Sequence, residues 1–201
     1  MKYFIIYVAL FLIWLYALTI FKRKKIEFFH FLAGSVGMFF FLFFVLEQIL
    51  TPYLIQFVCF LTGLLGSMTN LFEAYSSYGI LFIHNINGPI SLYVDFECAG
   101  LIEILVFISL ISFYNVYRLW EKIGVCIAGI ALIMFSNVIR LFSICLIINF
   151  YGNESYYFAH TIVGRLLFYG LSIILYFYVF TRTQIRKQRV GEFGYADEIG
   201  K

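Results

Sequence analysis

Long hydrophobic runs, separated by short charged clusters, dominate the sequence. Five of them are close to or above the roughly 20 residues that a helix needs to cross the hydrocarbon core of a membrane. These runs are residues 3–21, 28–48, 99–117, 123–150 and 161–181, and a sixth run, 53–65, is shorter. Continuous runs of this kind favour helices over the alternating strands of a barrel. The pattern therefore predicts an all-α integral membrane protein, a helical bundle of about five to six spans.

Basic residues gather in three clusters, which set the predicted topology. The clusters are residues 22–25, Arg118 with Lys122, and 182–189, and residues 26–117 contain no lysine or arginine. The positive-inside rule places all three in the cytoplasm. The runs 28–48 and 99–117 then cross outward and back, so residues 53–65 are expected to form a re-entrant or interfacial helix on the outer side. The N-terminus is expected outside and the C-terminus inside.

A different pattern lies between residues 77 and 97. Two short runs rich in Ile, Val, Phe and Tyr flank Asn87-Gly88, which is a strong hairpin signal. A small extracytoplasmic β-hairpin is therefore predicted directly before Cys98. No linker divides the chain, so residues 1–190 are expected to form a single polytopic membrane domain and residues 191–201 a short polar cytoplasmic tail.

Composition narrows the class of protein further. Of the 201 residues, 63% are hydrophobic and only 12% are charged, which is half the charged share of about 25% in a typical soluble domain. An ordinary cytosolic enzyme is excluded, and the lipid bilayer is the first expected partner. The sequence contains no closely spaced Cys/His set and no phosphate-binding glycine loop. No metal, no cofactor and no nucleic-acid partner is therefore expected.

Three residues from distant parts of the sequence are expected at one depth near the outer surface. Cys98 starts the 99–117 span, and His160 directly precedes the 161–181 span. Arg140 lies about 27 Å along its helix from Lys122, at 1.5 Å per residue. A thiol, an imidazole and a guanidinium can therefore meet on the extracytoplasmic side of the cell membrane, in a grouping suited to nucleophilic catalysis.

Each of these residues also has a structural interpretation. Cys98 can be a small buried hydrophobe, Arg140 a snorkelling residue and His160 an interfacial polar residue. The N-terminus of the following helix favours a Cys98 thiolate, whereas Glu97 and Asp95 act against it. An arginine inside a membrane costs about 2.5–3.5 kcal/mol, which usually marks a function or a buried partner.

Further polar residues are expected to support these three. Asn137 precedes the arginine by three positions on the same helix face and is expected to hold the guanidinium or the substrate. Glu103 and Arg165 are predicted at a similar depth, where a structural ion pair is favoured over catalysis. Glu97 and Gly100, on either side of the cysteine, complete the predicted supporting set.

Three motifs resemble those of the exosortase/archaeosortase family. Glu97-Cys98-Ala99-Gly100-Leu101 resembles its Cys-Ser-Gly-Leu motif, Asn137-Val-Ile-Arg140-Leu its Asn-x-x-Arg motif, and His160-Thr-Ile-Val-Gly164-Arg-Leu-Leu-Phe168 its His-x-x-x-Gly motif followed by an aromatic. Order and spacing agree from about residue 51 to 180. Ala99 replaces the usual serine, and fewer N-terminal spans are predicted than longer relatives have. The short length and basic cytoplasmic loops resemble the Gram-positive branch.

The resemblance implies a membrane cysteine protease or transpeptidase that cleaves C-terminal sorting signals of exported proteins. The implied substrate carries a short recognition motif, a transmembrane helix and a basic cytoplasmic end. Cys98 would attack the scissile carbonyl, His160 would relay the proton, and Arg140 would stabilise the thiolate or the oxyanion. Water or an amine acceptor would then release the product.

Two other classes of function stay open from the residues alone. A non-catalytic membrane assembly factor, serving surface polysaccharide or glycosyltransferase machinery, predicts that Cys98→Ala is harmless. A small transporter predicts a water-filled path lined by Arg140, Arg165 and Glu103, which the apolar inner halves of the spans disfavour.

Overall fold

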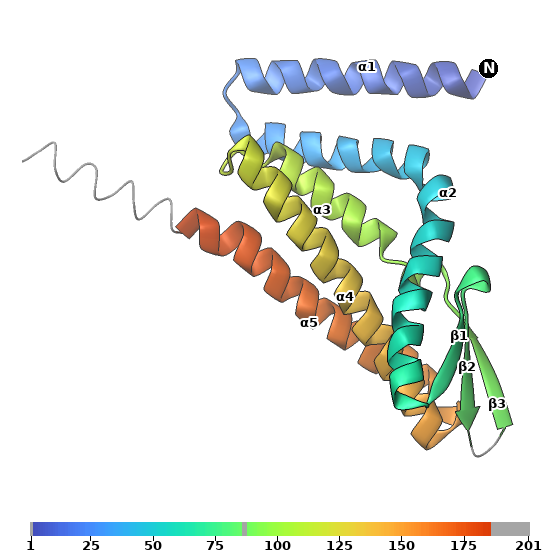
Figure 1. Ribbon diagram of the computed structural model, residues 1–201. Coiled ribbons are helices and arrows are strands. Elements are labelled where there is room, and N and C mark those ends of the chain that lie inside the picture. Colours follow the sequence, from blue (N-terminus) through green and yellow to red (C-terminus); the bar gives the residue numbers. More distant parts are fainter. Residues whose placement is uncertain (1, 86–87, 186–201) are drawn as a thin grey trace, which may run out of the picture.

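Helices make up most of the structure, a computed structural model that describes residues 2–85 and 88–185 (Figure 1). The chain begins with α1 (Lys2–Arg23) and α2 (Glu27–Thr69), followed by β1 (Phe72–Tyr75), β2 (Ile80–Asn85) and β3 (Gly88–Tyr93). It continues with α3 (Leu101–Phe113), α4 (Leu119–Tyr151) and α5 (Gly164–Tyr176). Two π-helical turns, η4 (Phe158–Val163) and η5 (Phe177–Thr181), flank α5. The predicted fold class, a helical membrane protein with a small sheet, is confirmed.

Among the described residues, fewer helices than predicted have the length and composition of a membrane span. By length and composition, three helical segments within the described residues can cross a membrane: Glu27–Thr69, Leu119–Tyr151 and Asn153–Ile185. α3 is equally apolar but has only 13 residues, fewer than the roughly 20 that a straight crossing requires. The run at 99–117 is therefore shorter as a helix than as a hydrophobic stretch, because the chain leaves the helix at Tyr114.

The predicted break between residues 48 and 53 is wrong. Residues 28–48 and 53–65 belong to one continuous helix, α2, which contains Pro52. Figure 1 shows that α2 changes direction along its length, running first beside α1 and then along the sheet. Pro52 removes one backbone N–H, and the Thr51 hydroxyl donates to the Glu47 carbonyl at 2.6 Å, both of which bend helices. The separate re-entrant helix of the predicted topology is thus the second half of a bent helix.

The sheet is antiparallel, with β2 between β1 and β3. The predicted hairpin is confirmed as the β2–β3 pair, in which Asn85 faces Gly88; Asn87 of the predicted turn lies outside the described residues. β1 was not predicted. It is only four residues long, and its buried Phe72 packs on Phe142 of α4 with ring centroids 6.0 Å apart. The sheet is therefore joined to the helices that carry the site.

One apolar core runs from the sheet to the middle of the helices. Its fully buried members come from α2, the central strand β2, the segment after β3, α3 and α4, and include Val58, Leu81, Ile83, Val94, Phe107, Leu141 and Ile144. Two tyrosines after α3 tie the last helix to this core. Tyr114 and Tyr117 donate to the backbone carbonyls of Phe180 and Val179, which lie in the widened turn η5, where the regular helical bonding changes. The predicted tail, residues 191–201, lies outside the described residues, and the single domain at 1–190 stays a prediction.

Candidate active site

Cys98 ends a short 3₁₀ turn, η2 (Phe96–Cys98), which joins β3 to α3. Asp95 caps this turn, because its Oδ1 accepts a hydrogen bond of 3.1 Å from the Cys98 backbone N–H. Gly100 follows with a φ of +75°, a left-handed conformation that lets the chain turn into α3. Only 3% of Cys98 is exposed. The thiol is therefore buried, and the backbone on both of its sides is fixed.

His160 reaches this thiol from the far end of the sequence. Its Nε2 lies 3.6 Å from Cys98 Sγ, which is hydrogen-bonding range for sulfur. His160 lies in η4, and π-helical turns are frequent at functional sites. Tyr156 stacks on the imidazole, with ring centroids 5.6 Å apart and ring planes 21° apart. The arrangement orients the imidazole so that a proton can pass between Sγ and Nε2.

Arg140 supplies a buried positive charge beside the turn that carries Cys98. It lies on α4, is 5% exposed, and its Nη1 donates to the backbone carbonyl of Glu97 at 3.4 Å. The guanidinium carbon lies 5.9 Å from the centroid of the Phe168 ring, within cation–π range. Its Nε has no hydrogen-bond partner in the described part of the structure. The three residues predicted from separate motifs, Cys98, Arg140 and His160, are thus brought together.

Burial raises the pKa of the Cys98 thiol to about 12. The positive charge of Arg140 lowers this pKa, while the charge of Asp95 and its hydrogen bond raise it. The stabilisation of a thiolate expected from the nearby helix N-terminus is therefore outweighed by desolvation. At neutral pH the site holds a thiol beside an imidazole, and forming a nucleophile requires transfer of the thiol proton.

The raised pKa predicts the pH dependence of thiol alkylation. In a purified variant whose only cysteine is Cys98, alkylation by a maleimide is expected to be slow at pH 7. Its rate is expected to rise about tenfold per pH unit up to at least pH 9, because the thiolate fraction grows in that proportion below the pKa. Arg140→Gln is expected to slow alkylation further at every pH, since Arg140 lowers the pKa. A rate that levels off below pH 8 would show an activated thiolate and contradict the expectation.

Asn137 and Gly100 form a close contact two residues after the cysteine. Asn137 is 1% exposed, and its Nδ2 donates to the Ile133 carbonyl at 3.2 Å. A Cβ on Gly100 would overlap this Nδ2, so the turn after Cys98 rests against the amide of Asn137. Asn137 Oδ1 has no partner among the described residues. The predicted role of Asn137, to hold the guanidinium or the substrate, stays a prediction. The structure shows instead that Asn137 contacts the turn at Gly100.

A cavity of about 320 Å³ opens beside the Glu97 carbonyl that Arg140 holds. Both members of the predicted ion pair, Glu103 and Arg165, lie in its wall, but no ion pair joins them in the described part of the structure. The pairing therefore stays a prediction. The wall is completed by Phe96, Glu97, Ile102, Arg140, Phe168 and Tyr169. Carboxylates, guanidiniums and aromatic rings thus share one cavity next to the nucleophile.

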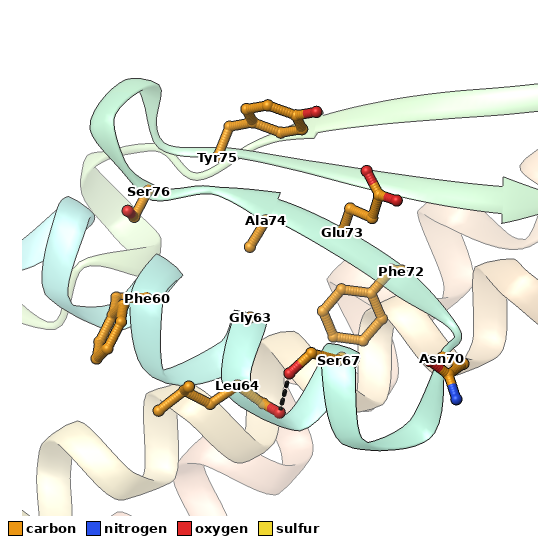
Figure 2. A pocket seen from close by; sticks show the side chains of 11 residues that line it. Phe60, Gly63, Leu64, Ser67, Asn70, Phe72, Glu73, Ala74, Tyr75 and Ser76 are labelled. Atoms are coloured by element: carbon orange, nitrogen blue, oxygen red, sulfur yellow. Dashed lines mark hydrogen bonds between the residues drawn. The ribbon is translucent and has the colours of Figure 1, made fainter.

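A second, larger cavity of about 570 Å³ lies between α2 and β1 and shares no lining residue with the first. Figure 2 shows Ala74 and Phe72 of β1 pointing toward α2, and Glu73 and Tyr75 pointing away from it. A Cβ on Gly63 would overlap that of Ala74, so helix and strand approach closely at this point. The cavity is therefore a gap beside a strand–helix contact, apart from the Cys98 site.

Two aromatic side chains of the site were not predicted to touch it. Tyr156 lies four residues before His160, and side chains at this spacing are neighbours on a helix. This spacing is the sequence signal from which the contact could have been predicted. Phe168 belongs to the third motif, but its contact with Arg140 depends on how α5 packs on α4. Within the described residues, no group of three or more His, Cys, Asp or Glu side chains is arranged to hold a metal ion.

Comparison with known proteins identifies a protein family. A protein-family model described as a transmembrane exosortase matches residues 1–178, a range that includes all three converging residues. No curated protein and no solved structure matches the chain. The Gram-positive branch stays a prediction.

Proposed function

Because the chain belongs to the transmembrane exosortase family, we propose that it is a cysteine protease or transpeptidase that cleaves C-terminal sorting signals of exported proteins. The proposed reaction occurs at the extracytoplasmic face of the cell membrane. Cys98 is the nucleophile, His160 the general acid and base, and Arg140 the electrostatic stabiliser. The protein itself is a multi-pass membrane protein with apolar helices of spanning length.

The distance of 3.6 Å between Cys98 Sγ and His160 Nε2 carries this proposal. The two residues are 62 positions apart, and both are largely shielded from solvent. The residue before Cys98, Glu97, lines a cavity whose wall also contains three further charged side chains, Glu103, Arg140 and Arg165. Such a combination of nucleophile, base and adjoining pocket is what acyl transfer requires.

The proposed reaction has two stages, acylation of Cys98 and release of the product, and it uses the side chains of Cys98, His160 and Arg140. On substrate binding, His160 Nε2 takes the thiol proton while Sγ attacks the scissile carbonyl carbon. The negative charge that develops on the carbonyl oxygen is stabilised by Arg140, which acts strongly because the surroundings are of low polarity. His160 then returns the proton to the departing amine, which leaves a thioester on Cys98. Water or an amine attacks this thioester and regenerates the thiol.

The cavity beside Glu97 suits a substrate that arrives within the membrane. Ile102 and Tyr169 in its wall are 37% and 56% exposed, and both face outward from the helices. A transmembrane helix of a sorting signal can lie against these two side chains while its outer end lies beside Glu97, the neighbour of Cys98. These exposed apolar side chains support the proposed substrate class, an exported protein with a C-terminal transmembrane segment.

The test compares the C-terminal peptides of exported proteins, by mass spectrometry, in cells that produce the wild type or Cys98→Ala. Exported proteins that lose a hydrophobic C-terminal segment only in the presence of the wild type are the expected result. Cys126→Ala is the matched control, because Cys126 lies on α4 and lines neither cavity. Identical C-termini in all strains would refute the proposal. Labelling of Cys98 in intact cells by an impermeant maleimide at high pH tests the extracytoplasmic placement.

A further inference from the structure

The outer edge of β3 is open. β3 pairs with β2 on one side, and Figure 1 shows no described element along its other side. An open sheet edge presents backbone N–H and C=O groups that can form hydrogen bonds with another polypeptide strand. Lipid cannot supply them, so this edge lies in water or against another polypeptide.

The register shows which backbone groups point outward. The Val94 N–H donates to the Gly79 carbonyl at 2.8 Å, and this bond continues the ladder in which Tyr93 faces Ile80. In an antiparallel pair, successive residues turn their N–H and C=O alternately toward the partner and away from it. Leu92 therefore bonds toward β2, as Val94 does, whereas Ser91 and Tyr93 present their N–H and C=O at the open edge.

Both outward residues are accessible. Tyr93 is 63% exposed and Ser91 is also exposed. Neither amide donates to a backbone carbonyl elsewhere in the described part of the structure. Pro89, two positions earlier, has no N–H and ends the row of donors on that side. The open edge thus offers two donor–acceptor sets spaced two residues apart, which is the repeat of an extended polypeptide.

The same edge leads to the nucleophile. From Tyr93 the chain passes through Val94 and the capping residue Asp95 and reaches Cys98 after five residues, a path of at most roughly 17 Å. A peptide aligned along β3 therefore extends toward the thiol. A ligand that bound only through its transmembrane helix would make no use of this edge.

We propose that the open edge of β3 receives the extramembrane segment of the substrate, next to the scissile bond, as an added fourth strand. The inference rests on the proposed function and deepens it, because it assigns part of substrate recognition to backbone hydrogen bonds at Ser91 and Tyr93. Strand addition of this kind recognises an extended polypeptide with limited dependence on its side chains. The occupant is the substrate, and the alternative, edge-to-edge pairing of two copies of this chain, is an outcome of the test.

The first experiment compares Ser91→Pro with Ser91→Ala. Proline is tolerated on an edge strand where the N–H faces outward, but it removes the donor, whereas alanine removes only the hydroxyl. Cleavage of an exported protein identified as above is expected to fall about three- to tenfold in Ser91→Pro, as for one hydrogen bond, and to stay unchanged in Ser91→Ala. Alkylation of Cys98 is expected to be equal in both, which shows an intact site. Equal cleavage by the two variants would overturn the inference alone, and no cleavage by the wild type would overturn the proposed function with it.

The second experiment does not depend on turnover. Ser91→Cys is placed in the Cys98→Ala chain, and single cysteines are scanned along the extramembrane segment of the same exported protein. Disulfide cross-links are expected at every second position, because alternate residues of an added strand face the same side. Cross-links without this alternation, or cross-linked dimers of the chain in place of substrate adducts, would overturn the inference.

Discussion

Cys98→Ala and His160→Ala are each expected to lower processing of the exported substrate by at least about 10³-fold. The first removes the atom that forms the thioester. The second is expected to be nearly as severe because burial raises the pKa of the Cys98 thiol to about 12, so the thiol cannot ionise at neutral pH without a base. General-base catalysis alone contributes roughly 10²–10⁴-fold. The measurement is the rate at which the C-terminal segment is lost in a pulse-chase of the labelled substrate.

The double variant separates a shared role from two independent ones. If Cys98 and His160 act in one step, the double variant is expected to be no slower than Cys98→Ala, since groups that act as a unit are strongly non-additive. A further loss in the double variant would contradict the proposed pairing. Alkylation of Cys98 in His160→Ala, followed at pH 9, controls for folding because it requires the thiol but no base.

The convergence of Cys98, Arg140 and His160 was predictable because Cys98 and His160 directly precede hydrophobic runs and Arg140 lies about 27 Å along its helix from Lys122, at 1.5 Å per residue. The charge distribution predicted that these three residues lie on one side of the membrane, and the motifs identified the residues themselves. That argument counted the run 99–117 as a return crossing, whereas α3 within it has only 13 residues, so the side of the membrane stays a prediction. The contact between Cys98 and His160 comes from the packing of the helices, at a distance of 3.6 Å between Sγ and Nε2.

The continuity of α2 was not predictable from local pattern. Pro52 and the polar residues before it are typical of a helix end, yet the helix runs through them with a change of direction. Packing decides this outcome: Val58 and Cys59, beyond the bend, are fully buried against the sheet and α4. Contacts with a strand that itself gave no sequence signal, β1, thus hold the second half of α2 in place.

The protonation state of the Cys98 thiol could also not be predicted from the sequence. The direction in which the charged neighbours act was predicted correctly, since Asp95 raises the pKa of Cys98 and Arg140 lowers it. The dominant cause is burial, which depends on how η2 packs under α4 and η4. Burial of a residue beside two carboxylates is a property of tertiary structure, and it makes the thiol the favoured resting species at neutral pH.

Gly100→Ala is expected to disrupt the site although Gly100 carries no chemistry. Two costs add at this position. A φ of +75° is unfavourable for alanine by about 1–2 kcal/mol, and the new Cβ would overlap Nδ2 of the buried Asn137, where overpacking costs about 1–3 kcal/mol. A loss of about 2–5 kcal/mol in the free energy of unfolding is expected. Because displacement of a catalytic group by about 1 Å can cost 10²-fold in rate, processing is expected to fall by about that factor.

The origin of this loss can be divided by a second substitution. Gly100→Ala combined with Asn137→Ala removes the overlap but keeps the unfavourable φ, so it is expected to restore about half of the lost stability, measured by thermal denaturation in detergent. Gly170→Ala is the matched control: Gly170 lies on α5, and a Cβ there meets no atom within 4 Å, so this helical replacement is expected to be neutral or stabilising by up to about 1 kcal/mol. If Gly100→Ala were as stable as Gly170→Ala, the close contact beneath Cys98 would not constrain the site, and the thiol would be held by Asp95 and His160 alone.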